Sequence, residues 1–177
     1  DKESHMLSFI PDIILPALTD LTPEMLTARG VRWLLLDFDN TIVPYTTDEP
    51  TEKMLAWLQK MQASPIRLCI VSNSKRPRVV RFAEKYGLDC ITHAKKPFSR
   101  GIRAAQARFG FEPREAALAG DQIYTDVLGA NSAGLTSVLV SAICNHNLPL
   151  KLRHVAELPF IAIGKRRIQH EQSGKIS

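Results

Sequence analysis

The sequence predicts one α/β domain built on a doubly wound, mainly parallel sheet of about five strands. Short apolar runs alternate along the chain with stretches of roughly ten residues that have helical character, the pattern of strands joined by crossover helices. Several of these helical stretches are followed by a glycine, which is a common helix stop. The length of 177 residues suits roughly one domain and leaves no room for a second large one.

The N-terminal segment, residues 6–30, is expected to form an amphipathic arm followed by a short helix. Prolines interrupt the apolar residues of the arm, and Thr22-Pro23-Glu24 is a good helix start with a Thr N-cap. The arm could lie in a membrane interface or pack on the domain, and packing is favoured because exposed apolar patches are scarce. Residues 1–5, ahead of Met6, are interpreted as an expression scar and take no part in the fold.

The remaining elements are expected to alternate through a domain that covers residues 31–150. The apolar run 31–36 suits a central strand that is buried on both faces. Residues 151–177 are expected to be a basic, partly flexible C-terminal extension. Further strands are predicted at 66–72, 90–93, 116–119 and 136–140, with helices at 52–62, 78–86, 99–109 and 125–133.

Composition excludes several classes of protein. Hydrophobic residues make up 45% and charged residues 23%, which excludes wholesale disorder. The net charge of +5 is compatible with nucleic acid, anionic lipid or phosphorylated substrates and selects none of them. Three cysteines without CxxC spacing favour a reducing compartment over a disulfide framework. We expect no transmembrane helix, because no apolar run reaches about 18 residues. We expect no secretory signal, because Pro11, Asp12 and Pro16 break the apolar stretch at 7–18 and it lacks a basic flank.

Polar residues follow four successive predicted strands. Ligands of doubly wound sheets bind at the carboxyl ends of the strands, so these side chains are expected to share one site. Carboxylates gathered there would repel one another unless a cation holds them, and oxygen ligands without a His/Cys cluster favour Mg²⁺ over zinc. The residues concerned are Asp37, Asp39, Asn40, Thr41, Ser72, Asn73, Ser74, Lys95, Lys96, Asp121 and Asp126.

These residue types suit phosphoryl transfer. A carboxylate can attack phosphorus and form an aspartyl-phosphate intermediate. A second carboxylate two residues further on can protonate the leaving alkoxide and then activate water. Hydroxyl groups and a lysine can hold the phosphoryl oxygens and balance the developing charge.

The motifs resemble, in order, the four motifs of the haloacid dehalogenase (HAD) superfamily. They read Asp37-x-Asp39-x-Thr41, Ser72, Lys96-Pro97 and Gly120-Asp121-x4-Asp126. The resemblance implies that Asp37 is the nucleophile and a Mg²⁺ ligand. Asp39 would be the acid/base and would lend its backbone carbonyl to the metal, while Lys96 would stabilise the transferring phosphoryl group. It further implies phosphate contacts from Thr41, Ser72 and Asn73, and metal contacts from Asp121 and Asp126.

Spacing argues against a cap domain. In this superfamily large caps are inserted after the first or the second motif. About 30 residues separate Thr41 from Ser72, and about 23 separate Ser72 from Lys96, lengths that one helix with its loops and short strand consumes. The mouth of the site is therefore expected to be open to a large substrate.

The chain is further similar to the YqeG-type subfamily of capless HAD phosphatases (subfamily IIIA). The similarity lies in residues 35–43, 71–74, 94–97 and 120–131. The subfamily includes mitochondrial and plastid phosphatidylglycerophosphate phosphatases, which implies release of phosphate from that lipid to leave phosphatidylglycerol. Apart from the resemblance, Lys75, Arg76 and Arg78 follow the predicted strand 66–72, so some of them are expected to form a basic rim of the pocket, with Lys75 and Arg76 in contact with the substrate. The alternative is that these residues form a solvated helix face.

These expectations describe a chain that docks peripherally on an anionic phospholipid membrane. It would lie in the cytoplasm or on the stromal or matrix side of an organelle, not be secreted, and bind no nucleic acid; an oligomer is compatible with the sequence. Two alternatives stay open. One is a HAD phosphatase of another open-site substrate, such as a phosphoprotein, nucleotide or sugar phosphate. The other is a non-catalytic RNA- or ribosome-binding module. The sequence argues against it, because it has no basic stretch interleaved with aromatic residues of the kind that binders of single-stranded nucleic acid use.

Overall fold

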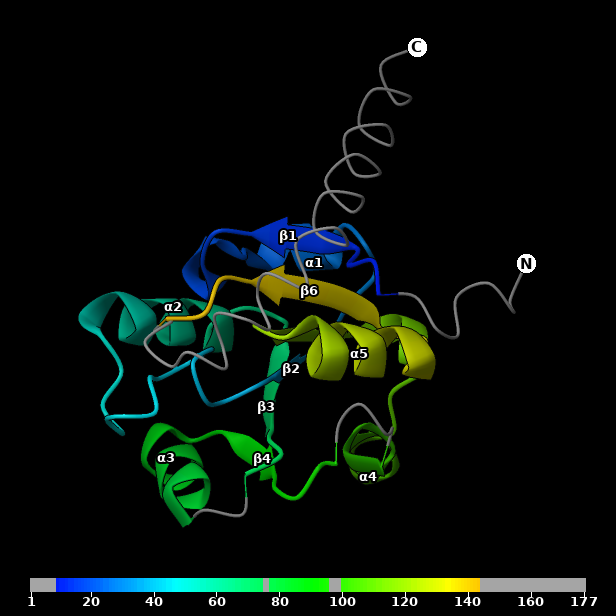
Figure 1. Ribbon diagram of the computed structural model, residues 1–177. Coiled ribbons are helices and arrows are strands. Elements are labelled where there is room, and N and C mark those ends of the chain that lie inside the picture. Colours follow the sequence, from blue (N-terminus) through cyan, green and yellow to red (C-terminus); the bar gives the residue numbers. More distant parts are fainter. Residues whose placement is uncertain (1–8, 75–76, 96–99, 144–177) are drawn as a thin grey trace.

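The computed structural model describes residues 9–74, 77–95 and 100–143. At its centre lies one sheet in which every paired strand runs parallel to its neighbours, in the order β1-β6-β5-β2-β3-β4 (Figure 1). The strands are β1 (Ile13–Leu15), β2 (Trp33–Leu36), β3 (Arg67–Val71), β4 (Asp89–Ile91), β5 (Ala116–Gly120) and β6 (Thr136–Val140), and the α-helices are α1 (Pro23–Thr27), α2 (Glu52–Gln62), α3 (Pro77–Tyr86), α4 (Arg100–Phe109) and α5 (Leu128–Ala133).

The predicted doubly wound α/β fold is confirmed, with one strand more than expected. The additional strand is β1, whose Ile13 lies beside Val138 of β6 in a parallel register. A strand of three residues between two prolines is too short to show the alternation typical of a strand. It becomes evident only from its pairing with β6. The residues after 143, including the predicted C-terminal extension, lie outside the described part of the chain.

The N-terminal arm packs on the domain itself. Phe9 meets the ring of Tyr124 edge-on with the centroids 5.6 Å apart, and the side-chain amide of Asn131 donates to the carbonyl of Ile10 at 3.0 Å. The side chain of Ile13 is buried. This agrees with packing, the favoured of the two sequence-based alternatives.

Two hydrophobic cores lie on opposite faces of the sheet. Along β2 the residues alternate, so that Leu34 and Leu36 join one core while Trp33 and Leu35 join the other. Residues of α1, α2 and α3 complete the first core, and residues of α4 and α5 complete the second. The result is a three-layer arrangement with helices on both faces (Figure 1), as a buried parallel sheet requires.

The strand order creates a switch point between β2 and β5. From β2 the chain proceeds to β3 and β4 on one side, then returns to place β5 and β6 on the other. The loops that leave the carboxyl ends of β2 and β5 diverge there, and such a crevice is the usual ligand site of an open parallel sheet. The polar residues predicted to share a site are therefore expected at this edge.

The connections between strands carry no large insertion in the described residues. The β2–β3 connection contains α2, and the β3–β4 connection contains α3, with no further helix or strand in either. This agrees with the expected absence of a cap. Among the described residues, none of the helices is long and apolar enough to cross a membrane.

Candidate active site

Asp37 and Asp121 stand on either side of the switch point. Asp37 directly follows β2, and its backbone N–H donates to the carbonyl of Ala119 in β5 at 2.9 Å. Asp121 directly follows β5. Both aspartates are more than nine-tenths buried, so their carboxyl groups sit in the crevice rather than on an open surface.

Asp126 completes a cluster of three carboxyl groups. One carboxylate oxygen from each of Asp37, Asp121 and Asp126 lies within 4.8 Å of the other two. Three buried negative charges at this separation repel one another, and a bound cation relieves that repulsion. An all-oxygen donor set of this kind suits Mg²⁺. The structure thus brings together three of the four predicted metal-binding residues by their side chains.

A π-helical turn places Asp126 in the cluster. The turn, η3 (Ile123–Val127), precedes α5 and replaces the first part of the helix predicted at 125–133. Its Asp126 is 1% exposed and accepts a hydrogen bond from the backbone N–H of Gln122 at 3.1 Å. A single π turn widens the helix locally and is frequent at functional sites, a feature that sequence periodicity does not show.

The absence of a side chain at Gly120 leaves space for the side chain of Asp126. A β-carbon added at Gly120 would lie 2.2 Å from both the carboxylate carbon and Oδ2 of Asp126. No side chain can therefore occupy position 120 while Asp126 keeps its place. The glycine of the Gly-Asp motif is explained by this contact.

The loop after β2 carries Asp39 and Thr41. Asn40 between them has a left-handed backbone (φ 59°), its N–H donates to the carbonyl of Val43 at 2.7 Å, and its carbonyl accepts from the N–H of Ile143 at 2.9 Å. The buried hydroxyl of Thr41 donates to Oδ1 of Asp121 at 3.3 Å. Thr41 thus connects the loops that follow β2 and β5.

Ser72 lies at the end of β3 and is 1% exposed. Its hydroxyl oxygen accepts from the N–H of Ser74 at 3.1 Å, and its carbonyl accepts from the N–H of Ala94 at 3.0 Å. Asn73 is exposed beside it. Ser72 therefore ties the loop after β3 to the loop after β4, on the same edge of the sheet as the carboxylates.

Three predicted site residues lie outside the described part of the chain: Lys75, Arg76 and Lys96. Their predicted roles stay predictions. Lys95, the neighbour of Lys96, is exposed and has a left-handed backbone with φ 53°, as does His93 with φ 57°. Non-glycine residues in this conformation are uncommon and often occur at functional loops.

Arg78 is the residue that sequence reasoning placed wrongly. It was expected on a basic rim, yet it is 7% exposed and lies inside the domain. Its guanidinium is 3.2 Å from Oδ1 of Asp39 and 2.7 Å from Oδ1 of Asp48. The partners are 39 and 30 positions away in the chain, so no local pattern could have revealed the contact.

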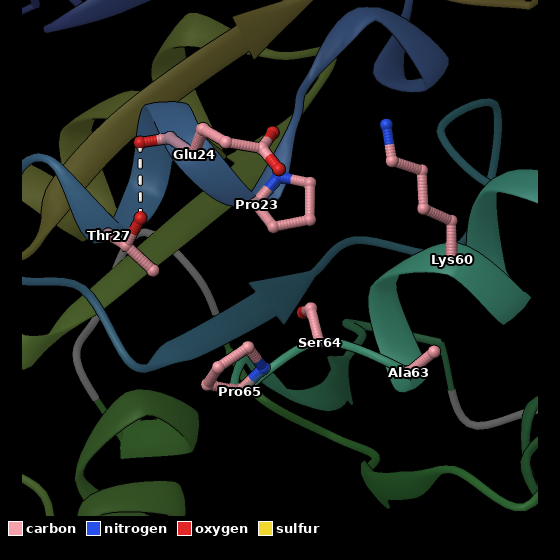
Figure 2. A pocket seen from close by; sticks show the side chains of 7 residues that line it. All are labelled: Pro23, Glu24, Thr27, Lys60, Ala63, Ser64 and Pro65. Atoms are coloured by element: carbon pink, nitrogen blue, oxygen red, sulfur yellow. Dashed lines mark hydrogen bonds between the residues drawn. The ribbon is translucent and has the colours of Figure 1, made fainter.

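Side chains of α1, of α2 and of the segment after α2 line a groove away from the carboxylates (Figure 2). This groove of about 370 Å³ lies between α1 and the end of α2, shortly before β3 begins. Its hydroxyl groups already donate within the chain, from Thr27 to the carbonyl of Glu24 and from Ser64 to that of Met61. None of the residues that line the groove belongs to the carboxylate cluster of Asp37, Asp121 and Asp126.

Comparison with known proteins agrees with the motifs. A family model described as HAD-hydrolase-like matches residues 93–142. The chain is 33% identical over 132 residues to the Bacillus subtilis (strain 168) protein named probable phosphatase YqeG, a match that covers 75% of this chain and 77% of that protein. The chain belongs to the YqeG-type family of HAD hydrolases. The resemblance stated from the motifs is thereby confirmed.

Solved structures share the fold at low identity. A HAD-superfamily subfamily III A hydrolase from Legionella pneumophila matches with a TM-score of 0.50 and 16% identity, over 73% of this chain and 74% of that one. The HAD hydrolase YfnB of Bacillus subtilis, solved bound to magnesium, matches with a TM-score of 0.50 and 14% identity, over 62% and 86%. At such identities the likeness shows the fold alone.

Proposed function

We propose that this HAD-family phosphatase is a Mg²⁺-dependent phosphomonoesterase that acts through an aspartyl-phosphate on Asp37. The observation that carries the proposal is the convergence of the Asp37, Asp121 and Asp126 carboxylates at the switch point. Three mostly buried oxygen ligands fit Mg²⁺ by charge and by donor type. When bound there, the ion would offset the carboxylate charges and polarise a phosphoryl oxygen.

The side chains of the loop after β2 supply the proton transfers. An oxygen of Asp37 attacks phosphorus, and the bond from phosphorus to the ester oxygen breaks as Asp39 gives its proton to that oxygen. Water then attacks phosphorus and gives a proton to Asp39, which frees Asp37 and inorganic phosphate. The hydrogen bond from Thr41 holds Asp121 in place. Phosphate contacts from Ser72 and Asn73 and charge stabilisation by Lys96 are part of the proposal.

We propose phosphatidylglycerophosphate as the substrate and phosphatidylglycerol as the product. Support comes from the YqeG-type similarity and from the short β2–β3 and β3–β4 connections, which leave the mouth without a cap in the described residues. Exposed Lys95 and Arg100 follow β4 at the edge that carries the carboxylates, and the chain has a net charge of +5. Such cations favour an anionic lipid surface. Since the arm is packed, peripheral docking would rest on this basic edge.

Phosphate release from phosphatidylglycerophosphate in detergent micelles tests the function. We expect release by the purified full chain with Mg²⁺, none with a chelator, and none from the isosteric variant Asp37→Asn. Equal turnover of nucleotide, sugar and protein phosphates with none of the lipid would support the alternative open-site substrate. Absence of release from every substrate, together with RNA binding, would support the non-catalytic alternative.

Vesicle flotation tests the docking. Vesicles that contain phosphatidylglycerol should carry the protein upward at low salt, and vesicles of phosphatidylcholine alone should not. The contrast should weaken in high salt, because surface attraction is screened over about 10 Å at 0.1 M salt. Equal recovery with both vesicle types, or none with either, would exclude the proposed anionic docking.

A further inference from the structure

In the described part of the chain, the polar contacts of the Arg78 side chain go to residues 39–48, which follow the predicted nucleophile. Arg78 lies in the first turn of α3, and its Nη1 donates to the carbonyl of Tyr45 at 3.2 Å. Its Nη2 donates to the carbonyls of Pro44 at 3.1 Å and Thr47 at 2.9 Å. The Asp39 and Asp48 carboxylates pair with the same group at 3.2 Å and 2.7 Å, as charge contacts rather than aligned hydrogen bonds.

A planar guanidinium suits this arrangement. Arginine offers five N–H donors in a fixed fork, whereas lysine concentrates its charge at one point and cannot bridge several carbonyls and two carboxylates at once. The group also lies over the ring of Phe38, 5.1 Å from the ring centroid. Residues 45–48 are exposed, and Arg78 contacts the carbonyls of two of them from inside the domain.

We propose that Arg78 is a positioning residue that holds the Asp39 carboxylate and the 44–48 loop in the geometry needed for proton transfer to the leaving group. This inference rests on the proposed function. Arg78 itself exchanges no proton. In the first step the bond from Asp37 to phosphorus forms, the bond from phosphorus to the ester oxygen breaks, and Asp39 supplies the proton that the departing oxygen takes.

If Arg78 positions Asp39, the effect of replacing it should depend on the leaving group of the substrate. An alkoxide leaving group needs the proton of Asp39, whereas p-nitrophenolate is stable enough to depart without it. The ratio kcat/KM reports the steps up to loss of the leaving group and leaves out the later attack of water, in which Asp39 takes part with both substrates. A misplaced Asp39 should therefore lower kcat/KM for an alkyl phosphate far more than kcat/KM for p-nitrophenyl phosphate. A general loss of structure would lower both values equally.

Steady-state kinetics of Arg78→Lys and Arg78→Ala on both substrates test the proposal. We expect kcat/KM on the alkyl phosphate to fall about 10- to 100-fold for the alanine variant, a partial loss of the roughly 10²- to 10⁴-fold that general acid–base catalysis contributes. The lysine variant should lose less, and kcat/KM on p-nitrophenyl phosphate should stay within about threefold of wild type for both variants. Arg81→Ala is the matched control, because Arg81 is an exposed arginine on the same helix.

Hydrogen exchange of the unliganded protein provides a readout that needs no activity. Faster exchange confined to residues 37–49 in the Arg78 variants, and absent from Arg81→Ala, supports the positioning role. Unchanged exchange there, or equal losses of kcat/KM on both substrates, would overturn it. If the wild-type chain hydrolyses no phosphomonoester, the proposed function fails. The exchange rates of residues 37–49 in the Arg78 variants still decide whether Arg78 holds the loop. If the alanine variant does not fold, the lysine variant gives both readouts.

Discussion

Alanine at position 120 tests how β5 and the π turn hold the carboxylate cluster together. The added β-carbon would lie 2.2 Å from Cγ and Oδ2 of Asp126 and 2.6 Å from its Cβ. Rotation of the Asp126 side chain cannot relieve the clash, because Cβ is attached directly to the backbone. The backbone of η3 must therefore move, or Gly120 must shift within the sheet.

The required movement can be estimated from the contact distances. Ordinary contacts of a β-carbon begin at 3.4 Å, so Cβ of Asp126 must retreat by about 0.8 Å (3.4 − 2.6) and its carboxylate by about 1.2 Å (3.4 − 2.2). Overpacking of this kind costs about 1–3 kcal/mol, which lowers the melting temperature of a domain this size by about 2–12 °C. A displaced carboxylate should also weaken Mg²⁺ binding by about 10- to 100-fold, the usual effect of disturbing a metal ligand's support.

Two measurements separate these effects. Calorimetric titration with Mg²⁺ gives the affinity, and thermal unfolding in chelator gives the stability without metal. Gly110→Ala is the matched control, because its φ of 70° makes alanine strained while its β-carbon meets nothing within 4 Å. It should lose stability without losing Mg²⁺ affinity. Wild-type Mg²⁺ affinity in Gly120→Ala would refute the assigned place of Asp126 in the metal site.

Three further outcomes are expected. Asp37→Asn should lower phosphate release by at least about 10³-fold while its melting temperature in chelator stays the same or rises, since one repelling charge is gone; retained activity would contradict the nucleophile. Burial raises the pKa of the Cys69 thiol from 9.0 to about 12, so the stability that its neutral form contributes is present below pH 9 and lost as the pH rises toward 12. Between pH 8 and 10.5, wild type should lose about 2 kcal/mol of unfolding free energy that Cys69→Ala does not lose, and parallel urea-unfolding profiles would contradict this. Gly101→Ala should cost about 1–3 kcal/mol in urea unfolding, because its β-carbon would lie 2.4 Å from Cβ of Ala94; an unchanged midpoint would contradict that packing.

Much of the fold could be predicted because its signals are local. The predicted helix at 52–62 and the predicted strand at 136–140 agree with α2 and β6. Threonine N-caps are equally local, as in the 3.2 Å hydrogen bond from the N–H of Met54 to Thr51. β1 was missed because three residues carry too short a pattern, and the π turn was missed because helical periodicity cannot separate it from an α-helix.

For the candidate site, too, the sequence predicted local features and missed those that depend on contacts between distant parts of the chain. That acidic residues follow the strands was evident from the sequence, because apolar runs end visibly at Asp37 and Gly120-Asp121. The close approach of Asp37, Asp121 and Asp126 depends on β5 pairing with β2, which is a long-range event. Arg78 was wrongly expected to be exposed, because a basic residue near a helix start is usually solvated. Its partners lie far away in the chain, so the sequence did not reveal its burial.

The sequence by itself determined the alternation of strands and helices, the family motifs and the residue types available for phosphoryl transfer. These follow from local periodicity and from the chemistry of each side chain. Only the tertiary structure decided that the arm forms an edge strand, that Gly120 leaves space for Asp126, and that Arg78 pairs with Asp39. The physical reason is that burial and ion pairing depend on distance in space, and the strand order brings together residues that the chain itself keeps far apart.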